Sequence, residues 1–186
     1  MTRRFFLLLI CIVFAGAQVS AQSTTTVVFL VRHAEKAAEP AADPPLTEAG
    51  VARAKALAAA LANTRVQAVI TTELVRTRET ARPLAEARGL SLETVHSGPR
   101  DAHAKAVADV VLAHAGQTVL VVGHSNTIPS IIAALGGPKL PDICDTQYSN
   151  LFVMIVRPGD KRADLMVSSY GAPSPDPAAT CPNSMK

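Results

Sequence analysis

The stretch Thr24-Thr25-Thr26-Val27-Val28-Phe29-Leu30-Val31-Arg32-His33 decides the fold of this chain and locates its chemistry. Its run of β-branched and apolar residues predicts a buried strand. In α/β folds, ligands bind at the carboxyl ends of such strands. Arg32 and His33 follow the strand directly, so a fixed cation and an imidazole are expected at that edge. An imidazole placed there can act as a nucleophile, and an adjacent guanidinium can hold an oxyanion.

A second apolar strand also ends in histidine, in the stretch Val121-Val122-Gly123-His124-Ser125-Asn126. Between the two lies Thr71-Thr72-Glu73-Leu74-Val75-Arg76-Thr77-Arg78, where either arginine can point towards the same edge from the first turns of a helix. Two histidines and two arginines would make a cationic pocket that selects a small anion, and phosphate matches the guanidinium fork best. The arginines also disfavour protonation of His33, which keeps a nitrogen lone pair available at neutral pH.

The rest of the chain reads as alternating strands and helices. Further strands are expected over 66–72, 90–95, 117–123, 150–157 and 163–169, and helices from Thr47 to about 61 and over 73–88, 100–114 and 126–135. Pro83 is expected to bend or divide the second helix. Val51 is expected on the face of the first helix that packs on the sheet, together with Ala54, Leu57, Ala58 and Leu61. The order predicts a three-layer α/β/α sandwich with a mostly parallel central sheet and an antiparallel edge.

The first 21 residues have the pattern of a signal peptide. A basic start at Thr2-Arg3-Arg4 precedes an apolar run over 5–17, and Val19-Ser20-Ala21 supplies small residues before a cleavage site. The alternative is an uncleaved anchor, but the run is short for a membrane span. Removal of residues 1–21 lowers the formal charge from +3 to +1, and no basic tract remains that would suggest nucleic acid. We therefore expect an exported protein, periplasmic or secreted, with no stable membrane anchor.

The remaining chain is expected to form one domain over 22–170 with a tail over 171–186. Once Cys11 leaves with the signal peptide, Cys144 and Cys181 remain, and an even pair in an exported protein favours a disulfide over two free thiols. Such a bond would hold the tail on the domain. Neither cysteine belongs to a CxxC pair or lies near a histidine in sequence, so no metal site is expected.

Four short sequence motifs, called blocks here, follow one another along the chain. They are Leu30-Val31-Arg32-His33-Ala34-Glu35, Pro45-Leu46-Thr47-Glu48-Ala49-Gly50, Arg76-Thr77-Arg78-Glu79-Thr80-Ala81 and Val122-Gly123-His124-Ser125-Asn126. Together they resemble the histidine phosphatase superfamily, which has the phosphoglycerate mutase-like fold, in a short form of its first branch. The resemblance covers the chain from about Val27 to Leu135.

The resemblance implies a role for each pocket residue. His33 would be the nucleophile that is transiently phosphorylated, Arg32 and Arg76 would hold the phosphoryl oxygens, and His124 would donate to the same oxygens. Arg76 is preferred to Arg78 because the family's arginine stands four residues before the threonine that matches Thr80. Ser125 is expected to assist phosphate binding through its amide. Asn126 is either a second such amide or a helix cap.

Departures from the family's mutases point to a phosphatase. The mutases have glycine after the histidine and asparagine six residues beyond it, whereas this chain has Ala34 and Glu39 and lacks their long insertions. The acid phosphatase branch is disfavoured because Ser125, and not aspartate, follows His124.

The proton donor is expected in the segment that follows the third strand. Asp101 is the first choice, with Glu35 and His96 behind it, although Asp101 is equally well explained as a residue favoured by the helix dipole. His103 and His114 are expected on the surface.

The leading hypothesis is an exported phosphatase that hydrolyses a phosphomonoester through a phosphohistidine, without metal or organic cofactor, with a small phosphorylated substrate or phosphate as ligand. The alternatives are a phosphohistidine or phosphoprotein phosphatase, and a non-catalytic phosphate-binding envelope domain. The sequence leaves the oligomeric state open.

Overall fold

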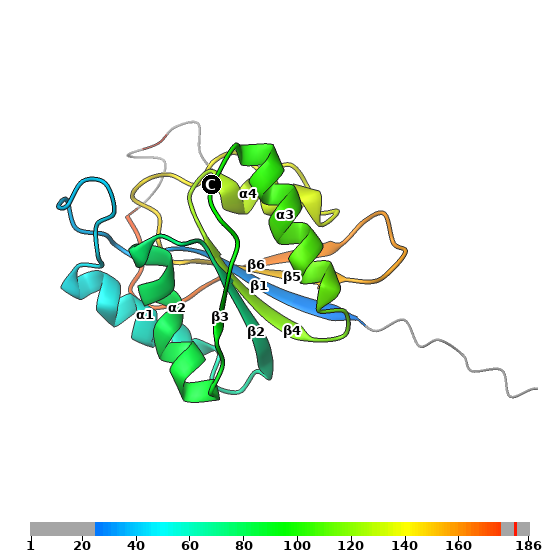
Figure 1. Ribbon diagram of the computed structural model, residues 1–186, viewed down its shortest axis with the longest axis horizontal. Coiled ribbons are helices and arrows are strands. Elements are labelled where there is room, and N and C mark those ends of the chain that lie inside the picture. The colour runs from blue at the N-terminus through cyan, green and yellow to red at the C-terminus, as the bar shows by residue number, and fades with distance from the viewer. Residues whose placement is uncertain (1–24, 176–180, 182–186) are drawn as a thin grey trace, which may run out of the picture.

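The computed structural model describes residues 25–175 and residue 181, so the expected signal peptide and part of the tail lie outside the described residues. Figure 1 shows one sheet between two pairs of helices, which confirms the three-layer α/β/α architecture. The strands are β1 (Thr26–Arg32), β2 (Val66–Thr71), β3 (Leu92–Thr94), β4 (Thr118–Gly123), β5 (Asn150–Val156) and β6 (Asp164–Ser169). The helices are α1 (Glu48–Ala60), α2 (Val75–Arg88), α3 (Arg100–Ala113) and α4 (Thr127–Ala134).

The sheet has the order β3-β2-β4-β1-β5-β6. The first four of these strands run parallel, while β5 is antiparallel to β1 and β6 is antiparallel to β5. In the register of the two central strands Arg32 pairs with Gly123. The residues that follow this pair are His33 and His124, so the hydrogen-bonding ladder itself sets the two histidines side by side at the carboxyl edge.

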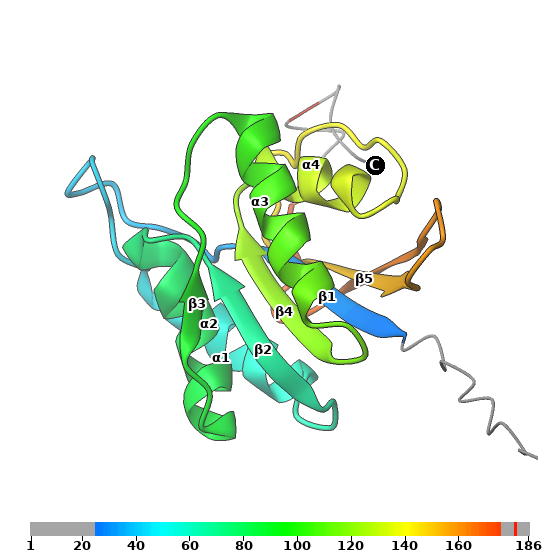
Figure 2. The same ribbon diagram turned by 45° about the vertical axis from the view of Figure 1, so that its right-hand side comes forward.

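Two apolar cores lie on opposite faces of the sheet. One contains apolar residues of α3 and α4, and the other contains apolar residues of α1 and α2. Figure 2 shows these two pairs of helices on opposite sides of the sheet. The inner strands carry nearly continuous apolar residues because both of their faces are covered. Within the described residues, no helix is both long enough and apolar enough to cross a bilayer.

The first helix packs largely through the face that its sequence predicts, with Ala54, Leu57 and Leu61 buried. Thr47 caps it as expected, accepting from the Gly50 amide at 3.1 Å. Val51, expected on the sheet face, is 43% exposed, whereas Arg53 is buried because its guanidinium pairs with Glu35 beneath the site. Val51 is the one residue of the predicted face that is exposed, and a period based on apolar residues alone could not anticipate the buried Arg53.

Three further expectations need correction. Helix α2 is a single helix with Pro83 inside it, and so Pro83 does not divide it. It begins at Val75 and not at residue 73, because the Asp43 carboxylate accepts from the Val75 amide at 3.0 and 3.2 Å. His103 is buried, with Nδ1 3.0 Å from the His96 carbonyl oxygen, whereas a surface position was expected.

Candidate active site

A cleft of about 550 Å³ opens at the carboxyl edge of β1, β2 and β4. Five of the six residues that the sequence suggested for the site line it: Arg32, His33, Arg76, His124 and Ser125. The other lining residues are Lys36, Leu74, Ser97, Gly98, Arg100, Asn126, Thr127, Asp142 and Asp145. Four arginine or lysine side chains and two carboxylates therefore face the cleft, which gives it a positive balance suited to an anionic ligand.

His33 is held in one orientation and one tautomer. Its side chain is buried, and Nδ1 lies 2.8 Å from the carbonyl oxygen of Ala34. A carbonyl oxygen only accepts, so Nδ1 carries the proton and Nε2 keeps its lone pair. The Ala34 amide in turn donates to Thr80 Oγ1 at 2.9 Å, which fixes the peptide that holds the ring. Nε2 is thus the nitrogen that can attack an electrophile.

Burial, with smaller contributions from Arg32, His124 and Arg76, lowers the pKa of His33 to about 3 against the opposing effect of the Ala34 hydrogen bond. The imidazole is therefore neutral at pH 7, which is the state needed for a nucleophile.

His124 stands beside it with the two ring centroids 5.4 Å apart in an edge-on arrangement. Its Nε2 lies 3.3 Å from Thr72 Oγ1, and its amide donates to Thr127 Oγ1 at 3.1 Å. Burial lowers the pKa of His124 to about 4, and Arg76 contributes in the same direction. Two neutral imidazoles can share this space without the repulsion that two imidazolium ions would suffer.

Arg32 is buried, and its guanidinium is hydrogen-bonded to a segment that lies far from β1 in the sequence. Nη1 donates to the carbonyl oxygens of Cys144, Asp145 and Gln147 at 2.9, 3.0 and 3.2 Å. Tyr148 covers the guanidinium, with the Arg32 carbon Cζ 4.2 Å from the ring centroid. The sequence analysis missed Tyr148 because it lies in an irregular segment whose path no periodicity predicts.

Arg76 enters the cleft from the first turn of α2. Its Nη1 lies 3.6 Å from the Asp43 carboxylate, the same group that caps α2. Asp43 was not anticipated, since it belongs to the loop between β1 and α1. Arg78 is exposed and does not line the cleft.

Each of the two arginines has a buried Nε–H donor that is not hydrogen-bonded to the described residues. Arg32 Nε and Arg76 Nε are buried and have no hydrogen-bond acceptor among the described residues. A buried N–H without an acceptor costs free energy, and most such groups in folded proteins are paired. The oxygens of an anion bound between these two arginines are natural acceptors for them.

Asp101 is not brought into the cleft. It lies in the first turn of α3, exposed, and lines a separate cavity with Pro129, Ser130 and Lys139 among others. The other two acid candidates are also elsewhere, since Glu35 pairs with Arg53 and the His96 side chain is 82% exposed. The helix dipole explains Asp101 without a role in proton transfer.

The acidic groups that do reach the cleft are engaged with arginines. Asp142 forms a two-point ion pair with Arg100 at 3.0 and 2.8 Å, and Asp145 lies 3.4 Å from Arg32. Asn126 occupies the N-cap position of α4 without a side-chain capping bond, which leaves its side chain at the cleft. No group of three His, Cys, Asp or Glu side chains converges as metal ligands in the described part of the chain.

The structure links Cys144 to Cys181 by a disulfide, with the Cα atoms 5.8 Å apart. This is the pair expected from the sequence, and it brings the tail to the segment that holds Arg32.

Comparison with known proteins finds a family model that matches part of this chain. Residues 28–97 match the family described as "Histidine phosphatase superfamily (branch 1)". The matched stretch contains three of the four sequence blocks, those of His33, Thr47 and Arg76. A comparison with the curated proteins finds no match.

Many solved structures share the fold. YhfR from Bacillus stearothermophilus is 20% identical, covers 79% of this chain and 98% of its own, and has a TM-score of 0.63. The protein histidine phosphatase SixA, complexed with tungstate, is 18% identical, with coverages of 77% and 96% and a TM-score of 0.61. A putative alpha-ribazole-5'-P phosphatase from Escherichia coli K-12 is 18% identical, with the same coverages and a TM-score of 0.59. At these identities the similarity establishes the fold.

Proposed function

Starting from the match to the histidine phosphatase superfamily, branch 1, we propose that this protein is a phosphatase that forms a phosphohistidine on His33. The observation that carries the proposal is the state of His33, which is buried, neutral and held through Nδ1 so that Nε2 is free to attack. Arg32 and Arg76 stand on the same cleft with buried Nε donors that lack acceptors. A phosphoryl group is the electrophile that satisfies both features at once.

The reaction has two steps. Nε2 of His33 attacks phosphorus as the bond from phosphorus to the leaving group breaks, with Arg32 and Arg76 balancing the charge on the equatorial oxygens. Water then attacks the phosphohistidine, the P–N bond breaks, and His33 is restored as inorganic phosphate and a proton leave. His124, edge-on to His33, is placed to donate to the same oxygens.

The absence of the expected acid from the cleft bears on the substrate. Asp101, Glu35 and His96 all lie outside the cleft lining. A poor leaving group such as an alkoxide needs a proton donor, whereas a phenolate, or an imidazole already protonated on its other nitrogen, departs more readily. This favours esters of acidic alcohols, and it gives weight to the second candidate function, hydrolysis of phosphohistidine on a protein. SixA, a structural relative, is named as a protein histidine phosphatase.

The test is hydrolysis of p-nitrophenyl phosphate by the mature protein without added metal, with His33→Ala as the inactive variant and vanadate as the inhibitor. We expect turnover that vanadate suppresses and that His33→Ala abolishes. Thermal unfolding of the variant at the wild-type temperature serves as the control for folding. Vanadate binding without turnover would identify a phosphate-binding domain, and turnover by His33→Ala would refute the proposal.

A phosphohistidine peptide and a phosphoserine peptide, offered at equal concentration, separate the two candidate substrate classes. We expect the phosphohistidine peptide to be hydrolysed faster if the leaving group governs the rate.

We also propose that the protein is exported from the cytoplasm. The expected signal peptide over 1–21 and the disulfide between Cys144 and Cys181 both suit an oxidising compartment. We expect a protein whose intact mass lacks residues 1–21 in a periplasmic or secreted fraction, and full-length protein in the cytoplasm would contradict this.

A further inference from the structure

The phosphate-facing Arg32 is positioned by a segment far from it in sequence, Cys144–Ser149, which we name the carbonyl loop. Three carbonyl oxygens of this loop accept from Nη1, and the Asp145 carboxylate and the Tyr148 hydroxyl lie 3.4 and 3.5 Å from Nη2. An arginine side chain loses rotational freedom when it is fixed, at a cost of up to about 2 kcal/mol. Because the loop fixes Arg32 when the protein folds, this loss of freedom does not oppose later binding of a ligand.

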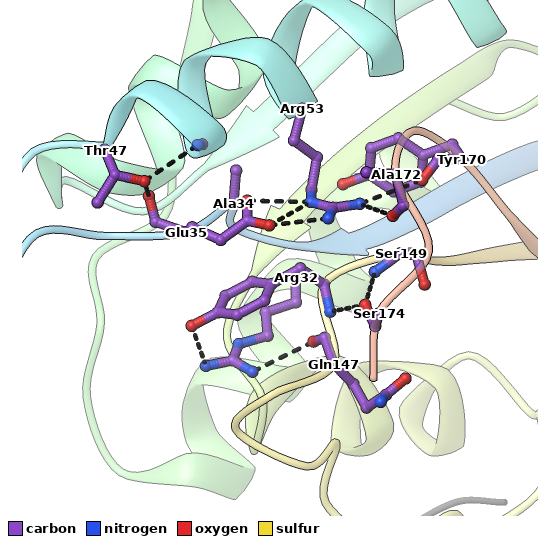
Figure 3. Close-up of polar contacts among 12 residues, drawn as sticks. Arg32, Ala34, Glu35, Thr47, Arg53, Gln147, Ser149, Tyr170, Ala172 and Ser174 are labelled. Carbon is purple, nitrogen blue, oxygen red and sulfur yellow. Dashed lines mark hydrogen bonds and ion pairs between the residues drawn. The ribbon is translucent and has the colours of Figure 1, made fainter. Parts of the chain in front are cut away.

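The carbonyl loop is itself held by the end of the chain. Ser174 Oγ accepts from the amides of Tyr148 and Ser149 at 2.9 and 3.0 Å. The Gln147 side chain donates to the Pro175 carbonyl oxygen, and Cys144 is bonded to Cys181. Figure 3 shows Ser174, on the chain end, hydrogen-bonded to the loop close to Gln147, whose carbonyl oxygen accepts from Arg32. The loop itself contains no helix or strand, and these contacts help to fix its path.

The other side of the chain end is also fixed. Arg53 Nη1 donates to the carbonyl oxygens of Tyr170 and Ala172 at 3.2 and 2.9 Å, while the rest of its guanidinium pairs with Glu35. Glu35 lies two residues after His33. The chain end therefore joins the segment after the nucleophile to the loop that holds the phosphate-binding arginine, as Figure 3 makes visible.

We propose that the described residues of the chain end, Tyr170–Pro175 and Cys181, are a positioning element for Arg32, and that the Cys144–Cys181 disulfide thereby sets the affinity of the cleft for phosphate. Ser174 and the disulfide touch neither substrate nor His33, and they act through the carbonyl loop. The proposal rests on the phosphatase function proposed above. When the anchor is removed, the loop samples other paths and Arg32 is no longer preorganised for the phosphoryl oxygens.

The first experiment measures inhibition by inorganic phosphate, together with kcat and KM on p-nitrophenyl phosphate, for Ser174→Ala, Ser174→Thr and Ser168→Ala. Ser168 is an exposed serine on the neighbouring strand β6 and is the matched control. We expect Ser174→Ala to weaken phosphate binding about tenfold, the equivalent of one hydrogen bond of ordinary strength. Ser174→Thr keeps the hydroxyl and should restore most of the affinity, and Ser168→Ala should match the wild type. Assays well below the melting temperature of each variant separate positioning from unfolding.

The second experiment compares the oxidised wild type, the wild type reduced with a phosphine, and the Cys144→Ser/Cys181→Ser variant with and without the same reductant. We expect reduction to weaken phosphate binding of the wild type to the level of the double variant, which the reductant leaves unchanged. Equal phosphate affinity in all of these proteins, with turnover retained, would overturn the positioning role while leaving the phosphatase function intact. A wild type that neither turns over the ester nor binds phosphate would instead refute the proposed function, and this inference with it.

Discussion

Gly50→Ala tests whether the first turn of α1 holds the segment that orients His33. A Cβ at Gly50 would stand 2.2 Å from the carbonyl oxygen of Glu35, whereas real Cβ atoms keep at least 3.0 Å from such an atom. Either the first turn of α1 or the segment after β1 that contains Glu35 must therefore move by at least 0.8 Å. Glu35 directly follows Ala34, whose carbonyl oxygen holds the His33 ring, so the displacement reaches that ring.

Gly50→Ala should affect catalytic activity more strongly than folding stability. Alanine in a helix is favoured over glycine by about 1 kcal/mol, while overpacking costs about 1–3 kcal/mol, which leaves a net loss of at most about 2 kcal/mol and a folded protein. A misplacement near 1 Å in a catalytic group lowers the rate by up to about a hundredfold. We therefore expect kcat/KM on p-nitrophenyl phosphate to fall by about tenfold to a hundredfold.

The matched control is Gly98→Ala, because a Cβ at that glycine meets nothing within 4 Å even though the residue lines the cleft. We expect its kcat/KM to stay close to that of the wild type. If Gly50→Ala remains folded and retains kcat/KM within about twofold of the wild type, a change equivalent to less than one weak hydrogen bond, the Glu35 backbone does not orient His33.

Three other predictions concern the arginines and the histidines. Arg76→Ala should weaken vanadate binding by about tenfold to a hundredfold, the range expected for a charged hydrogen bond, and exposed Arg78→Ala should change it little; equal losses in the two titrations would refute the assignment. Arg53→Met should lower the free energy of unfolding, measured in urea, by about 3–5 kcal/mol because it leaves the partly buried Glu35 carboxylate without its ion-pair partner. Adding Glu35→Gln to this variant should recover part of the lost free energy. The pKa of His33 is lowered on folding to about 3, so its stabilising contribution is complete above its unfolded pKa and is lost as pH falls below about 6.5. The loss is about 1.4 kcal/mol per pH unit for each such histidine, and urea titrations at pH 7, 6 and 5 should show a shallower decline for His33→Asn than for the wild type.

The parts of the site that the sequence predicted are those fixed by strand register. Arg32 and His124 follow apolar strands, and parallel pairing of those strands brings the two histidines together without any knowledge of loops. Arg76 was placed by its distance from Thr80 in a family motif, and its entry into the cleft follows from the start of α2. Elements with a strong period were likewise located to within a few residues.

The parts that the sequence did not predict depend on side chains reaching across the chain. The Asp43 carboxylate accepts from the amide at the start of α2, and Arg53 is buried in an ion pair with Glu35 while Val51 is exposed. The position of Asp101 depended on the path of the segment between β3 and α3, which has no periodic pattern. Tyr148 was invisible for the same reason.

The most direct test of the central claim is to trap the covalent intermediate. The mature protein is mixed with p-nitrophenyl phosphate, quenched in base within the first turnover, and digested for mass spectrometry. The account predicts one phosphoryl group on the peptide that contains His33, stable to base and lost in acid, and absent from His33→Ala. A phosphoryl group on another residue, or turnover in the variant that lacks His33, would contradict the account.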